Sequence, residues 1–184
     1  MRFIIGFLVT IGLIILIIVL LLRGGGTATP TPKALTLADH ATGSSYAEFF
    51  IDAPVVSQQK HREVKITVSQ NEVAFTQYQG YEDSIVSSQT YPNNSEAYEV
   101  FLRALQHQNF TVGSTDKALS DERGYCPQGS RYIYSFNDGS KQLMRFWSTS
   151  CGGQGTFKGL PTSVRNLFQA QVPDYNRLSR GLYN

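Results

Sequence analysis

The feature that most constrains this chain is an uninterrupted apolar segment near its N-terminus. Residues 3–22 read FIIGFLVTIGLIILIIVLLL and contain no charged side chain. An α-helix of this length rises about 30 Å, which is the thickness of the hydrocarbon core of a bilayer. Only a helix satisfies the backbone hydrogen bonds of a single segment in lipid, so residues 1–23 are predicted to be a transmembrane helix.

This segment has two alternative fates, a retained signal anchor or a cleaved signal peptide. The apolar core of a signal peptide usually has about 7–15 residues, so the greater length of 3–22 favours retention. The small residues Gly26 and Ala28 keep cleavage open, because they suit a signal-peptidase site. Arg2 precedes the segment and few basic residues follow Arg23. This asymmetry predicts a single-pass cell-membrane protein with a cytoplasmic N-terminus and an extracytoplasmic C-terminal domain.

Residues 24–44 are predicted to be a flexible linker between the membrane and a folded domain at 45–184. The run Gly24–Gly26 removes stiffness, and Pro30 and Pro32 favour an extended chain. The whole chain has 16 Lys+Arg against 14 Asp+Glu, a net charge of +2. Arg2 and Arg23 flank the apolar segment and account for this excess. The neutral remainder argues against nucleic acid as a partner.

The folded domain is predicted to be α+β, with an antiparallel sheet of about five or six strands and two packed helices. Residues 63–69 (EVKITVS) alternate apolar and polar side chains, which is typical of a half-buried antiparallel strand. After Pro92, apolar residues recur at helical spacing through about residue 107. The further predicted strands are 46–52, 73–78, 85–91, 131–136 and 141–148, and the further predicted helices are 161–171 and a short one within 174–180.

The two strands after residue 130 are predicted to form a hairpin, because Asp138-Gly139 is a preferred two-residue loop. With that loop, residues whose numbers sum to 277 face each other. The only two cysteines of the chain, Cys126 and Cys151, then lie opposite each other. We therefore predict a disulfide, which implies an oxidising compartment. Two buried thiols or a thiol-based active site are the alternatives.

Catalytic and metal-binding motifs do not stand out in the sequence. His40, His61 and His107 are scattered, and H-E-x-x-H, C-x-x-C and G-x-S-x-G do not occur. The glycine-rich stretch 152–159 lacks the spacing of a phosphate-binding loop. The sequence therefore predicts no catalytic residue, no metal ligand and no cofactor, although enzymatic activity stays open.

The leading functional hypothesis is a membrane-anchored, non-catalytic extracytoplasmic domain that binds a protein or an envelope component. Its expected partners are the lipid bilayer and that unidentified component. The alternatives are a hydrolase acting on cell-wall polymers, with Asp121-Glu122 or Glu82-Asp83 in its cleft, and a structural subunit of a membrane assembly. Because tyrosine is favoured in interfaces, the expected interaction surface comprises Tyr132, Tyr134, Trp147 and Phe157.

Overall fold

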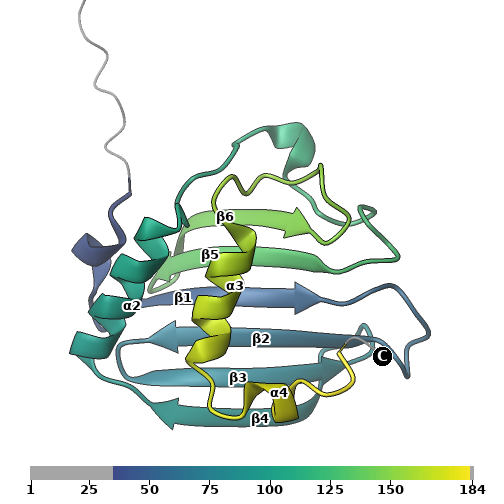
Figure 1. Ribbon diagram of the computed structural model, residues 1–184, viewed down its shortest axis with the longest axis horizontal. Coiled ribbons are helices and arrows are strands. Elements are labelled where there is room, and N and C mark those ends of the chain that lie inside the picture. Colours follow the sequence, from purple (N-terminus) through teal and green to yellow (C-terminus); the bar gives the residue numbers. More distant parts are fainter. Residues whose placement is uncertain (1–34, 183–184) are drawn as a thin grey trace, which may run out of the picture. The chain divides into compact units, whose positions relative to one another are not determined.

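The first strand of the domain, β1 (Ser45–Asp52), lies in the middle of the sheet. The computed structural model describes residues 35–182, in which six strands follow the order β4-β3-β2-β1-β5-β6 (Figure 1). Every neighbouring pair is antiparallel. The remaining strands are β2 (Arg62–Ser69), β3 (Glu72–Gln79), β4 (Ser84–Pro92), β5 (Arg131–Asp138) and β6 (Lys141–Thr149).

Two helices of at least two turns and one short helix cover a single face of the sheet (Figure 1). They are α2 (Ser95–His107), α3 (Pro161–Ala170) and α4 (Tyr175–Leu178). Asn94 caps α2 by accepting a hydrogen bond from the Ala97 N–H at 2.9 Å. Pro161 is the first residue of α3. A backbone N–H at this position has no partner within the helix, so proline, which lacks one, is tolerated there.

The core lies between these helices and the sheet, and aromatic rings build much of it. Along β1, every second residue is buried, and Phe49 and Ile51 are fully buried beneath the helices. The Phe49 ring stacks on Phe168 of α3 at a centroid distance of 5.5 Å. Phe101 of α2 meets the same Phe168 ring edge-on at 5.2 Å. Alternation along the strands thus directs one set of side chains toward α2 and α3.

A long connection covers part of the opposite face of the sheet. It contains the 3₁₀ turn η2 (Lys117–Leu119) and runs from α2 to β5. The indole Nε1 of Trp147 donates to the Leu119 carbonyl at 2.6 Å, and the Tyr125 ring lies 5.0 Å from the Trp147 ring. Arg145 and Glu122 form an ion pair at 2.6 Å. The connection therefore buries the only tryptophan of the chain on this side.

The predicted fold class is confirmed: the domain is α+β, with a six-stranded antiparallel sheet and packed helices. The predicted hairpin register is wrong. The loop consists of Gly139 and Ser140, since Asp138 pairs with Lys141, and a bulge follows at Phe136/Asn137. Gly139 has φ +57°, which glycine adopts without strain.

The bulge changes which side chains share a face. Because it adds one residue to β6, it moves every later β6 side chain to the other face relative to β5. Trp147 consequently pairs with Ile133 and lies on the face opposite Tyr132 and Tyr134. In the predicted register, where facing residues have numbers that sum to 277, Trp147 would share the face of both tyrosines.

Among the described residues, 35–44 belong to the same compact unit as the sheet, although the sequence predicts them to be part of the linker. The 3₁₀ turn η1 (Leu37–His40) packs on α2. Leu37 is fully buried, and its N–H donates to the Gln106 Oε1 at 2.9 Å. The predicted transmembrane segment 1–23 and the linker through residue 34 lie outside the described residues. Within 35–182, we find no helix with both the length and the apolarity needed to cross a bilayer.

Candidate functional site

One face of α3 is polar and borders two cavities. Thr162, Arg165, Asn166 and Gln169 follow the i, i+3, i+4, i+7 spacing that places side chains on one side of a helix. The apolar residues of α3 point elsewhere, and Phe168 is fully buried in the core. The packing of α3 on the sheet therefore leaves this polar face directed along the domain surface.

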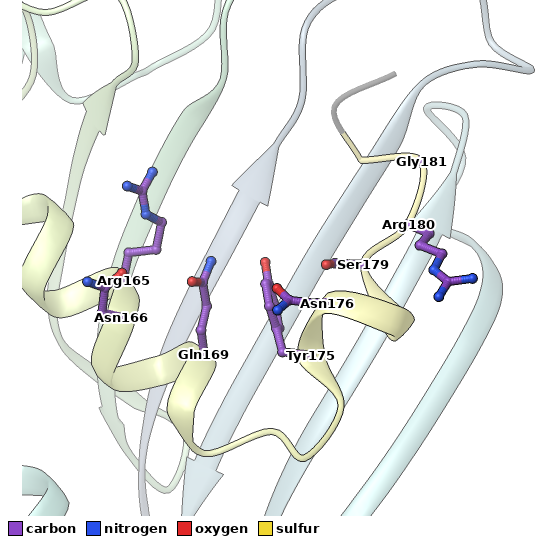
Figure 2. A pocket seen from close by; sticks show the side chains of 8 residues that line it. All are labelled: Arg165, Asn166, Gln169, Tyr175, Asn176, Ser179, Arg180 and Gly181. Carbon is purple, nitrogen blue, oxygen red and sulfur yellow. The ribbon is translucent and has the colours of Figure 1, made fainter.

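The first cavity lies between α3 and the segment containing α4, and has a volume of about 600 Å³. Figure 2 shows Arg165 and Arg180 at opposite ends of the row of lining residues, with Gln169 and Tyr175 between them. No carboxylate occurs among the lining residues that the structure describes. They are Arg165, Asn166, Gln169, Tyr175, Asn176, Ser179, Arg180 and Gly181.

The α4 wall of this cavity is held by buried contacts with the sheet. Leu178 and Leu182 are buried, and the Tyr175 ring meets Phe75 of β3 edge-on at 6.1 Å. Gln77 Nε2 donates to the Arg180 carbonyl at 3.3 Å. Burial raises the pKa of Tyr175, although Gln169 and Ser179 lie close enough to oppose that shift. The wall is therefore an ordered part of the domain that presents neutral hydrogen-bonding groups beside the two arginines.

The second cavity lies at the N-terminal end of α3 and has a volume of about 350 Å³. It shares Arg165 with the first cavity. The Arg165 guanidinium lies 5.6 Å from the centre of the Tyr132 ring, and its Nη1 donates to the Tyr132 hydroxyl at 3.4 Å. Arg165 is thereby positioned between the cavities. This cavity is lined by Tyr132, Tyr134, Thr149, Ser150, Pro161, Thr162 and Arg165.

The Tyr134 hydroxyl in the second cavity is held neutral by burial. Burial raises the pKa of Tyr134 to about 12, and the hydrogen bond between its hydroxyl and Ser148 Oγ, 2.9 Å long, opposes the shift only in part. In the described part of the chain, the buried Thr149 Oγ1 has no hydrogen-bond partner. Arg165 therefore supplies the only formal charge among the described residues that line this cavity.

The four aromatic residues of the expected interaction surface are all buried by the protein itself. Their exposed fractions are 8% for Tyr132, 0% for Tyr134, 1% for Trp147 and 6% for Phe157. Phe157 stacks on Tyr134 at 4.1 Å, and Trp147 lies under the connection on the other face. Only Tyr132 and Tyr134 line either of the two α3 cavities. The structure thus brings two of the four residues to the polar face of α3.

The predicted disulfide between Cys126 and Cys151 is confirmed, with a Cα–Cα distance of 5.9 Å. Both cysteines lie outside the strands, Cys126 before β5 and Cys151 after β6. A turn closed by the Gly129 N–H and the Cys126 carbonyl (3.0 Å) brings the first cysteine back toward the second. The pairing therefore does not depend on the register that was used to predict it.

Sequence reasoning missed Arg165, Gln169 and Arg180. The spacing of Arg165 and Gln169 within a predicted amphipathic helix was a readable signal for a shared polar face. Nothing local indicated Arg180, because its position depends on the turn after α3 and on contacts with β3.

The acidic pairs expected in a hydrolase cleft lie elsewhere. Asp121 pairs with Arg123 at 2.6 Å, and Glu122 pairs with Arg145. Neither pair lines the α3 cavities, and neither does Glu82 or Asp83. No family model and no curated protein matches the sequence.

Proposed function

We propose that this chain is a membrane-anchored, non-catalytic binding module that holds an anionic glycan of the cell envelope along the polar face of α3. The observation that carries the proposal is the pair of cavities that share Arg165 and have no carboxylate among their described lining residues. Guanidinium groups bind carboxylates or phosphates, and amides and hydroxyls suit a hydroxyl-rich ligand. The apolar segment 3–22 supports anchoring of the chain in a membrane. The disulfide supports a location of the domain in an oxidising compartment.

The composition of the cavities favours a glycan over a protein partner. The residues that contribute most of the binding energy in protein interfaces are typically Trp, Tyr and Arg side chains that become fully desolvated in well-packed pockets. Here the aromatic rings of Tyr132 and Tyr134 are largely covered, and most of the lining residues carry a hydroxyl, amide or guanidinium group. Cavity volumes of about 600 and 350 Å³ lie in the range of small-ligand sites, which corresponds to single units of a polymer.

Binding of defined polymers to the full-length chain in mild detergent tests the proposal. Isothermal titration calorimetry compares polygalacturonate, which carries carboxylates, with a phosphomannan, which carries phosphates, and with neutral dextran. We expect saturable binding of at least one anionic polymer and no binding of dextran. The two anionic polymers distinguish carboxylate from phosphate as the recognised group.

Variants locate the binding on α3. Arg165→Gln removes the charge shared by the two cavities, and we expect affinity to fall roughly tenfold or more, because hydrogen bonds to charged groups contribute about 1.5–3 kcal/mol. Arg177→Gln is the matched control, since Arg177 belongs to α4, pairs with Asp174 and lines neither cavity. If neither anionic polymer binds, or if Arg165→Gln binds as tightly as wild type, the proposal is wrong.

A further inference from the structure

A buried histidine lies between two carboxylates at the end of β1 and the start of β2. His61 has an exposed fraction of 0%, and its Nε2 lies 3.2 Å from Glu63 Oε1 and 3.5 Å from Asp52 Oδ1. Asp52 and Glu63 are register partners across the β1/β2 ladder. Asp52 follows the buried Ile51 in the alternation of β1, so the cluster lies on the sheet face opposite α3.

The tautomer of His61 follows from its other nitrogen. Nδ1 lies 3.2 Å from the Pro54 carbonyl oxygen, which only accepts hydrogen bonds, so Nδ1 carries a hydrogen. In the neutral ring, Nε2 then directs a lone pair at the two carboxylate oxygens. Three electron-pair donors converge, and this arrangement requires a cation at their centre, either a proton or a metal ion.

The surroundings leave the cluster short of positive charge. Arg131 is nearly buried and binds Asp52 through Oδ2, with Nε and Nη2 both at 2.7 Å. This interaction orients the carboxylate and leaves Oδ1 directed toward His61. Within residues 35–182, Asp52 Oδ1 is buried and has no hydrogen-bond partner. One arginine faces two carboxylates here, so one negative charge remains to be balanced.

We propose that Asp52 Oδ1, His61 Nε2 and Glu63 Oε1 bind a divalent transition-metal ion of the Zn²⁺ class. Zn²⁺ bonds of about 2.0–2.2 Å to nitrogen and oxygen place tetrahedral ligands about 3.3–3.6 Å apart. The two distances from Nε2, 3.2 and 3.5 Å, are close to this value, and all three ligand atoms lie within 4.8 Å of one another. Water completes the fourth position.

Groups around the ligands act as the supporting shell that metal sites need. The Pro54 carbonyl fixes the His61 ring through Nδ1, and Arg131 fixes Asp52. The Tyr81 ring stacks on the His61 ring at 4.1 Å, and its hydroxyl donates to the Val56 carbonyl at 2.8 Å. The side chains of Asp52 and Glu63 are 18% and 14% exposed, which gives an ion a route of entry.

Zn²⁺ binding to the full-length chain, stripped of metal by chelator and purified in mild detergent, tests the proposal. Calorimetry is expected to show one equivalent of Zn²⁺ bound by wild type. Glu63→Gln keeps the shape of the side chain and removes one ligand charge, so we expect affinity to fall at least tenfold. His40→Gln is the matched control: His40 Nδ1 lies 3.6 Å from Asp138 Oδ2, a histidine–carboxylate contact distinct from the proposed ligand set.

A second measurement keeps the test decisive if Glu63→Gln fails to fold. Wild type is titrated with Zn²⁺ while the three histidine ring signals, those of His40, His61 and His107, are followed by NMR. We expect the His61 signal alone to change at one equivalent. Absence of Zn²⁺ binding by wild type, an unchanged His61 signal with the ion bound, or wild-type affinity in a folded Glu63→Gln variant overturns the proposal. Glycan binding on the α3 face is scored separately, so the two proposals fail independently.

Discussion

Removing the disulfide is expected to destabilise the domain by an amount that follows from the length of the loop it closes. Cys126 and Cys151 are separated by 25 residues. Loop-closure entropy for that length gives about 3.5 kcal/mol of stabilisation at 25 °C, through restriction of the unfolded chain. This is a large share of the stability typical of a domain, about 5–15 kcal/mol.

The perturbation is the double variant Cys126→Ala/Cys151→Ala, compared with wild type in urea. The single tryptophan, Trp147, is buried beside Tyr125, so its fluorescence reports unfolding of this part of the domain. We expect the free energy of unfolding to fall by about 3–4 kcal/mol. The urea dependence is expected to steepen, because the unlinked chain exposes more surface when unfolded.

Wild type treated with a reductant is the control, and its unfolding curve should match that of the double variant. A thiol assay under denaturing conditions should find no free thiol in oxidised wild type and two after reduction. A loss of less than about 1 kcal/mol in the double variant would refute the loop-entropy argument.

Two further predictions concern backbone space and alkaline pH. Gly155→Ala is expected to lower the free energy of unfolding by about 2 kcal/mol or more, because Gly155 has φ +141° and a Cβ there meets the Trp147 carbonyl oxygen at 2.5 Å. Gly153→Ala is the control, because Gly153 has φ +78° but open space around it, and it should lower the free energy of unfolding by only about 1 kcal/mol. Equal losses of stability for the two variants in urea titrations would contradict this account. Burial raises the pKa of both Tyr98 and Tyr134 to about 12. In the unfolded chain the pKa of a tyrosine is about 10. The neutral hydroxyls therefore contribute fully to the stability of the folded state below about pH 10, and this contribution is lost as pH rises toward about 12. Urea midpoints that do not change between about pH 10 and about pH 12 would contradict the prediction.

The local elements of this fold could be predicted because each carries its own pattern. The alternation over residues 63–69 identified β2, and the helical spacing after Pro92 identified α2. The central position of β1 could not be predicted, since it depends on pairing with β5, far along the chain. The hairpin register failed because a single bulged residue, which no local preference specifies, changes the face of every later side chain.

The candidate sites were harder to predict than the fold, because both are assembled from distant segments. The α3 cavities combine a helix face with Tyr132 on β5 and with the segment after Pro173. In the other cluster, His61 directly precedes β2 and Glu63 lies within it, so these two residues are close in sequence. Asp52 and Arg131, which complete the cluster, are brought there only by the sheet order.

The most direct test of the central claim is photocrosslinking in intact cells from the polar face of α3. A photoreactive amino acid replaces Asn166, an exposed residue that lines the first cavity, and in a control chain it replaces the exposed Arg103 of α2, which lines neither α3 cavity. The account predicts adducts from position 166 alone, and it predicts that their mass falls on treatment with enzymes that degrade envelope glycans. Adducts with cytosolic proteins, or equal glycan adducts from position 103, would contradict it.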